Sequence, residues 1–261
     1  MAPDIQLLQA SIDEDDESEF RMLVDKKAVK YITIAPGLFS NDDMCFAPSL
    51  ISHLPPFPPG GWNEVFIARD PKSGHAYFES VRTSHLPGIT PTWHVTQIDH
   101  LELTMGDKLR SNVYEATCPR FPSTVVAKFA RFAWEIPQLA EETRAYSLIE
   151  GQGIGPEFLG YLTEEGRVIG FLMEHIKGAH HAEPDDFQAC HRVLSKLHKL
   201  GLKHGDINKH NFLVREGQAT LIDFDVVTKE AGREELDAEL ASLRDSLADE
   251  SGRGGRIVEE K

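Results

Sequence analysis

The residues with the clearest capacity for chemistry lie in the run HGDINKHNFLVREGQATLIDFD, residues 204–225. Asp206 is followed five residues later by Asn211, and Asp223 comes twelve residues after Asn211. Apolar runs on either side of the polar turn 215–218 predict a β-hairpin, which would return Asp223 to the side of the other two residues. Phosphoryl transfer from ATP uses such a set, in which one Asp orients a hydroxyl while an Asn and an Asp hold Mg²⁺. Each aspartate alone could be a turn residue that accepts backbone N–H groups, so the prediction depends on the joint pattern.

The order and spacing of these residues resemble the catalytic loop and the metal-binding motif of the protein-kinase-like superfamily. The resemblance implies transfer of the γ-phosphoryl group of ATP to a hydroxyl of a protein or small-molecule acceptor, with ATP and Mg²⁺ as cofactors. Asp206 would then be the catalytic residue that acts on the acceptor, and Asn211 and Asp223 the metal ligands. His204 would brace the loop. Asn208 stands where protein kinases often place a lysine, so turnover is expected to be slow.

Residues farther upstream resemble the nucleotide-binding half of the same superfamily. Lys128, in the run VVAK, resembles the lysine that binds the ATP phosphates, and Glu142 resembles its ion-pair partner on the next helix, in preference to Glu141. The alternative is an exposed lysine beside a solvated glutamate. The segment 173–176 resembles the hinge whose backbone binds adenine, and two apolar side chains would enclose the base. The residues expected to bind ATP are Val126, Lys128, Met173, Glu174, Ile176 and Leu213.

The chain departs from the protein-kinase pattern in three places. The stretch 106–111, where kinases have a glycine-rich turn over the phosphates, contains a single glycine; backbone N–H groups could still approach phosphate there, and Lys108 or Arg110 could add charge. Gly205 replaces the arginine that often pairs with a phosphorylated activation loop. Only 38 residues follow Asp223, which leaves no room for a long activation segment or the usual substrate-binding helices.

The pattern of apolar residues predicts an α+β fold of the two-lobed protein-kinase-like type, with a truncated C-terminal lobe and a β-rich N-terminal extension. From residue 100 onward the order is strand-strand-strand-helix-strand-strand, as in a kinase small lobe, and helices are expected at 184–200 and 234–249. The expected parts are an acidic disordered tail (1–20), a β-rich extension (21–95), a small lobe (96–176), a truncated large lobe (177–250) and a flexible tail (251–261).

Composition limits the compartment and the partners. The 261 residues carry a net charge of −15, which disfavours a nucleic-acid partner or an anionic membrane. The three cysteines have no paired spacing, which favours a reducing compartment. The N-terminus has no apolar signal-peptide core, and the apolar runs are too short to cross a bilayer. A cytoplasmic or nuclear protein is therefore expected, with ATP and an acceptor as ligands and a protein partner for the N-terminal extension.

The HGD triplet with a short tail resembles aminoglycoside-phosphotransferase-like enzymes, RIO kinases and the minimal kinase of the tRNA-modifying KEOPS complex. Most of the chain is also similar to a set of kinase-like proteins in filamentous fungi, including Pro58, Trp62, Trp93 and the final SGRGG. Two alternatives stay open. The chain could be a pseudokinase or ATP-binding scaffold without catalysis, or the N-terminal extension could be the functional element and the kinase fold its support.

Overall fold

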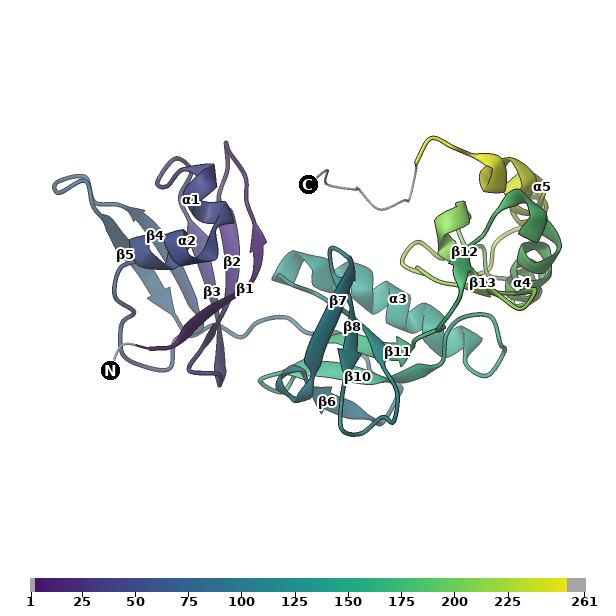
Figure 1. Cartoon of the computed structure of the whole chain (residues 1–261), viewed down its shortest axis with the longest axis horizontal. Helices are drawn as coiled ribbons and strands as arrows, with labels where there is room; N and C mark the ends of the chain where they lie inside the picture. The colour runs from purple at the N-terminus through teal and green to yellow at the C-terminus, as the bar shows by residue number, and fades with distance from the viewer. Residues whose placement is uncertain (1–2, 253–261) are drawn as a thin grey trace. The chain divides into compact units, whose positions relative to one another are not determined.

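A computed structural model of the chain describes residues 3–252 (Figure 1). The fold is mixed α+β, with several sheets and few helices. The chain separates into two compact units, one made of residues 1–87 with 131–133 and the other of residues 88–130 with 134–261. Each unit has its own hydrophobic core, so each has its own source of stability.

The first unit is a five-stranded sheet in the order β1-β2-β3-β4-β5 (Figure 1). Its strands are β1 (Ile5–Ser11), β2 (Ser18–Val24), β3 (Ala28–Ile34), β4 (Glu64–Arg69) and β5 (Ala76–Arg82). Strands β3 and β4 pair in parallel, and the crossover between them contains the short helices α1 (Asn41–Cys45) and α2 (Ala47–His53). Phe20, Met22 and Ile32 from the sheet pack with Leu50 of α2 in the core.

The prediction of a disordered acidic tail over residues 1–20 is wrong. Strand β1 and the first part of β2 occupy this region and pair antiparallel. Most of the acidic run, Asp13 to Glu17, lies in the turn between them, where the Asp13 carboxylate accepts the backbone N–H groups of Asp15 and Asp16 at 2.9 Å. The apolar residues of β2 are therefore free to enter the core, and Phe20 is fully buried. A charge count over the whole segment hid the two strands that flank the turn.

The second unit begins with a six-stranded sheet in the order β6-β10-β11-β9-β8-β7. The strands are β6 (Gln97–Asp99), β7 (Thr104–Arg110), β8 (Val113–Thr117), β9 (Val125–Phe129), β10 (Phe158–Glu164) and β11 (Arg167–Glu174). Helix α3 (Ile136–Ile149) follows β9, as predicted, and buries Leu139, Tyr146 and Ile149. The strand order was expected to begin at residue 100 with a strand over 100–104, but residues 100–102 form a 3-10 turn that is capped by Asp99.

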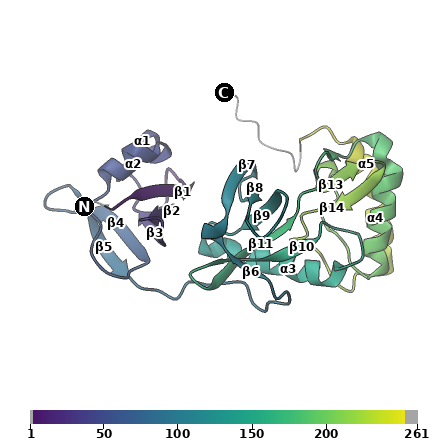
Figure 2. The ribbon, with the colours of Figure 1, turned by 60° about the horizontal axis from the view of Figure 1, so that its bottom comes forward.

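The rest of the second unit is built on helices and a small sheet. Helix α4 (Phe187–Lys199) lies beside α5 (Arg233–Ala248) (Figure 2). The three-stranded sheet contains β12 (His180–His181), β13 (Phe212–Arg215) and β14 (Gln218–Leu221). Strands β13 and β14 form the predicted hairpin. Helix α5 carries a leucine stripe at positions 236, 240, 243 and 247, of which Leu243 and Leu247 are buried.

Two sequence-based expectations concern the ends and the membrane. The flexible tail predicted for 251–261 falls almost entirely outside the described residues. Within residues 3–252, none of the helices combines the length and the apolar character needed to cross a bilayer.

Candidate active site

A cavity of about 310 Å³ opens in the second unit, between the six-stranded sheet and the predicted catalytic loop, residues 204–211. Its volume is in the range of small-molecule sites. Residues from β9, the end of β11 and β13 line it, so segments far apart in sequence share one wall. The lining includes every residue that the sequence predicted to bind ATP: Val126, Lys128, Met173, Glu174, Ile176 and Leu213.

Lys128 lies between two carboxylates at the floor of this cavity. Its Nζ is 2.7 Å from Oε2 of Glu142 and 2.5 Å from Oδ1 of Asp223. The side chains of Lys128 and Glu142 are only 9% and 1% exposed, so the ion pair is buried. Glu141 instead forms an exposed ion pair with Arg144 at 2.6 Å. The predicted pairing of Lys128 with Glu142 rather than Glu141 is confirmed.

The three charges set one another's protonation. Burial alone would lower the pKa of Lys128, but the adjacent Glu142 and Asp223 outweigh it and hold that pKa above its ordinary value. Burial raises the pKa of Glu142 to about 7, against the opposing effect of Lys128. Burial also acts to raise the pKa of Asp223, but Lys128 and Arg110 outweigh it and the pKa lies below its usual range. Asp223 is therefore the carboxylate that stays ionised at neutral pH.

The catalytic loop folds around the side chain of Asp206. Its Oδ2 accepts from the amide nitrogens of Asn208 at 2.9 Å and of Asn211 at 3.1 Å. Asn211 also donates to the backbone oxygen of Asp206 at 2.9 Å. Asn208 caps the turn by accepting the backbone N–H of His210 at 2.9 Å. The Asn211 amide group is thereby fixed with its oxygen directed away from Asp206.

His204 braces the loop in the way that the sequence suggested. The side chain is fully buried, and its Nε2 lies 3.1 Å from the backbone oxygen of Ile222, one residue before Asp223. Its Nδ1 accepts the backbone N–H of Asp206 at 3.3 Å. A carbonyl can only accept, so Nε2 carries the hydrogen and the ring is neutral. Burial lowers the pKa of His204, which agrees with this tautomer.

Glu239 of α5 anchors the same loop, and the sequence analysis missed it. Its carboxylate accepts the backbone N–H groups of His204 at 3.0 Å and Gly205 at 2.7 Å, and it lies 2.7 Å from Nε2 of His198. The leucine stripe of α5 was visible in the sequence, but a glutamate beside such a stripe is ordinarily solvated. Only the docking of α5 turns Glu239 toward the loop.

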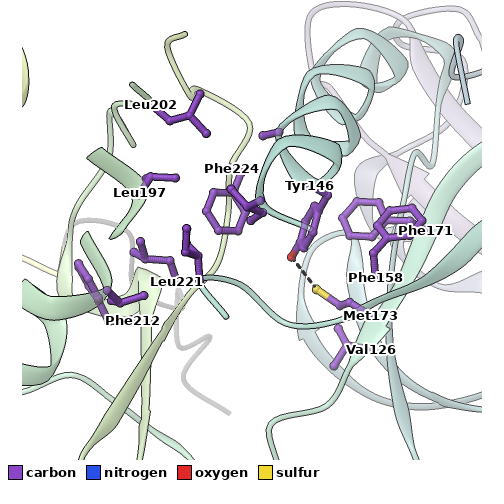
Figure 3. Close-up of a cluster of buried hydrophobic side chains, with 14 of the residues drawn as sticks. Val126, Tyr146, Phe158, Phe171, Met173, Leu197, Leu202, Phe212, Leu221 and Phe224 are labelled. Carbon is purple, nitrogen blue, oxygen red and sulfur yellow. Dashed lines mark hydrogen bonds between the residues drawn. The ribbon is translucent and has the colours of Figure 1, made fainter. Parts of the chain in front are cut away.

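An aromatic cluster links Phe224, the residue after the predicted metal ligand Asp223, to helix α3 (Figure 3). The ring of Phe224 lies 5.2 Å from that of Tyr146 and 5.4 Å from that of His204. The Tyr146 hydroxyl donates to Sδ of Met173 at 3.2 Å, on the wall of the cavity. A Cβ atom at Gly155 would come within 2.9 Å of the Phe224 ring, so the backbone approaches that ring closely. Phe224 is therefore held from several sides.

Arg110 was considered only as a source of charge near phosphate, yet it contacts both predicted metal ligands. Its Nη1 donates to Oδ2 of Asp223 at 2.9 Å, and its Nη2 donates at 3.4 Å to Oδ1 of Asn211 and to the backbone oxygen of His210. The stretch 106–111 is mostly strand β7, and the open turn of the hairpin is at Ser111 and Asn112. The loop that was expected to cover the phosphates is thus shorter than the stretch 106–111 that resembles the kinase glycine-rich turn.

The donor set of Asn211 and Asp223 suits Mg²⁺. An amide oxygen and an ionised carboxylate face the same cationic group, and Mg²⁺ prefers oxygen ligands of this kind, completed by phosphate and water. Among residues 3–252 no cluster of three or more His, Cys, Asp and Glu side chains forms a separate metal site.

Comparisons with known proteins agree with a kinase-like chain. Residues 172–254 match the model of the lipopolysaccharide kinase (Kdo/WaaP) family. The chain is 23% identical over 150 residues, which are 52% of this chain and 28% of the relative, to the probable bifunctional tRNA threonylcarbamoyladenosine biosynthesis protein of Methanothermobacter thermautotrophicus. It is 32% identical over 93 residues, 33% of this chain and 17% of the relative, to the protein of the same name from Methanospirillum hungatei.

The chain therefore spans less than a third of the length of these relatives. The matched family segment contains the catalytic loop, the hairpin and α5, and supports a kinase-like phosphotransferase. The relatives are archaeal, and the resemblance to fungal kinase-like proteins stays a prediction.

Proposed function

We propose that this chain is a Mg²⁺-ATP-dependent phosphotransferase that acts on a hydroxyl group. The observation that carries the proposal is a connected set of side chains at one cavity: Lys128 and Asp223 line it and form an ion pair, Arg110 joins Asp223 to Asn211, and Asn211 donates to Asp206. In this assignment the six-stranded sheet with α3 is the small lobe, and α4, α5 and the small sheet are a truncated large lobe.

Each residue has a defined task in the proposed reaction. Lys128, held by Glu142, would bind the ATP phosphates, and Asn211 and Asp223 would hold Mg²⁺, which neutralises phosphate charge when bound. Asp206 would accept the proton of the acceptor hydroxyl. The hydroxyl oxygen would attack the γ-phosphorus, and the bond between that phosphorus and the oxygen of the leaving ADP would break. His204 and Glu239 would act only by fixing the loop.

The acceptor is a hydroxyl of a protein or of a small molecule. The archaeal relatives are named for tRNA modification, but the net charge of −15 gives no support for direct binding to nucleic acid. We propose that the first unit, with its independent core, provides the surface for a protein partner.

A direct experiment is a thermal-shift titration with ATP, with and without Mg²⁺, followed by incubation with γ-labelled ATP. Ligand at about a hundredfold over its Kd should stabilise the fold by about 2.7 kcal/mol. Release of labelled phosphate, or its transfer to an added acceptor, would establish turnover. A protein that shows neither a shift nor any turnover does not have the proposed function.

A pseudokinase is the second candidate, because Arg110 occupies the predicted metal ligands. In that case ATP would bind with or without Mg²⁺, and no labelled phosphate would be released or transferred. The same pair of measurements separates the two functions.

A further inference from the structure

Arg110 reaches the metal ligands because of a local irregularity in the β7–β8 hairpin. The register of this antiparallel pair shifts between Lys108, which lies opposite Tyr114, and Arg110, which lies opposite Val113. Such a shift changes which way a side chain points. The Lys108 side chain is exposed and does not line the cavity, whereas Arg110 is half-buried and does. The two basic residues of this strand therefore have different environments.

The guanidinium of Arg110 stands where a shared cation would bind. One of its nitrogens is 2.9 Å from Oδ2 of Asp223, and the other is 3.4 Å from Oδ1 of Asn211. The second carboxylate oxygen of Asp223 is taken by Lys128 at 2.5 Å. Arg110 is thus the group that satisfies the side of Asp223 facing Asn211.

A divalent ion and this guanidinium cannot share the two oxygens. Mg²⁺ lies about 2.0–2.1 Å from its ligands and resists distortion of its octahedral shell. An ion at that distance from Oδ2 of Asp223 would fall on the volume that Nη1 fills. Charge leads to the same conclusion, because the two cations Lys128 and Arg110 already face ionised Asp223, and among residues 3–252 the only other carboxylate paired with Lys128 is Glu142. A further divalent charge would be unfavourable until negative phosphate arrives or Arg110 leaves.

We propose that the guanidinium of Arg110 occupies the predicted metal site formed by Asn211 and Asp223. This guanidinium must be displaced before a divalent metal ion binds there. The proposal deepens the proposed function, since it rests on Asn211 and Asp223 as metal ligands. It predicts that the free protein binds a divalent ion weakly, and that the ion is admitted together with the nucleotide phosphates. Arg110 therefore makes binding of the metal ion depend on the nucleotide.

The test is Mn²⁺ binding to the full-length protein without nucleotide, measured by electron paramagnetic resonance and by calorimetry. Mn²⁺ accepts the same oxygen ligands as Mg²⁺. We expect Arg110→Ala to bind one Mn²⁺ about tenfold or more tightly than the wild type. Lys108→Ala removes the same charge from the same strand and should behave as the wild type. Adding Asp223→Ala to Arg110→Ala should abolish the gain.

Arg110→Gln keeps the length and polarity of the side chain and serves if the alanine variant melts early. The proposal is overturned if neither Arg110 variant binds Mn²⁺ more tightly than the wild type, if Lys108→Ala gains as much, or if the gain survives loss of Asp223. A failure of the proposed function is distinguishable. If Arg110→Ala gains Mn²⁺ affinity through Asp223 but no label is ever transferred, the metal site stands and the phosphotransferase does not.

Discussion

At the scale of single residues, substitution of Asp206 should impair turnover, whereas substitution of Asp223 should impair Mg²⁺-dependent binding of ATP. Asp206 holds two asparagine amides through one oxygen, so Asp206→Asn is the variant that best preserves an acceptor there. It should keep nucleotide affinity but lower turnover by about 10²-fold or more, because the proton acceptor is lost. Asp223→Ala should instead lose Mg²⁺-dependent binding of ATP. Calorimetry and labelled-phosphate transfer on both variants check this, and equal loss of ATP binding would refute the assigned roles.

Glu142 should make stability depend on pH near neutrality. Burial raises its pKa to about 7 in the folded protein, from an ordinary value of 4.5. An acid with a raised pKa binds its proton more tightly in the folded state, so its contribution is present at low pH and is lost as the pH rises through about 7. Between about pH 5 and about pH 8, the wild type should therefore lose free energy of unfolding relative to Glu142→Gln.

Urea unfolding of both proteins across this range measures the difference. Glu141→Gln is the matched control, since Glu141 is exposed in the same turn of α3 and pairs only with Arg144 in the hydrogen bonds described. If the wild type and Glu142→Gln follow parallel curves, the carboxyl group of Glu142 does not titrate in this window.

At the scale of elements, α5 should stabilise the catalytic loop through one carboxylate. Glu239 accepts two backbone N–H groups and contacts His198, and it is 7% exposed. Glu239→Ala leaves buried donors without a partner, at a cost of about 2–4 kcal/mol. Asp237→Ala, at an exposed position of the same helix, should change stability by less than about 0.5 kcal/mol. Chemical denaturation of both variants measures the contrast, and similar values would show that the Glu239 contacts add little.

The segment after Phe224 should not act as a phosphorylation switch. Thr228 exchanges two backbone hydrogen bonds of 2.9 Å with Lys203, and the N–H of Ala231 donates to Gly201 at 3.1 Å. A switch needs a segment with two arrangements, and this one is pinned to the strand-like residues before the catalytic loop. Thr228→Ala and Thr228→Glu should therefore match the wild type in phosphate transfer. A tenfold loss with alanine that glutamate restores would mean about 1.4 kcal/mol of coupling that the fold does not suggest.

The position of a residue within its element also decides whether its role could be predicted from the sequence. Asp206, Asn211 and Asp223 were recognisable because one loop and one hairpin carry all three, so linear spacing reports their geometry. Helix α3 was visible because its apolar face repeats at helical intervals. Arg110 reaches across 113 residues of sequence to Asp223, and Glu239 across 35 to His204, so no local pattern signals either contact. Arg110 further depends on a register shift in β7, which composition does not reveal.

At the scale of the whole molecule, the first twenty residues should be required by the first unit. Strand β1 lies at the edge of its sheet, and Phe20 of β2 is fully buried in its core. Removing residues 1–20 takes away all of β1 and part of β2, so the melting temperature of this unit should fall by several degrees or its transition should vanish. Calorimetry of the truncated chain measures this. An unchanged melting profile would show that residues 1–20 are dispensable for folding.

The two units should also melt separately, because each buries its own core and the cavity belongs to the second. Phe20→Ala and Phe224→Ala each remove a fully buried ring, at a cost of about 3–5 kcal/mol, but from different cores. Phe20→Ala should lower one transition and leave the other, and Phe224→Ala should do the reverse. Mg²⁺-ATP should raise only the transition that Phe224→Ala lowers, since ligand binding stabilises the unit that holds the site. Scanning calorimetry with and without the nucleotide records both transitions in one trace. A single transition that responds to both substitutions and to the nucleotide would show that the units unfold as one, and the first unit would then have to be treated as part of the nucleotide-binding fold.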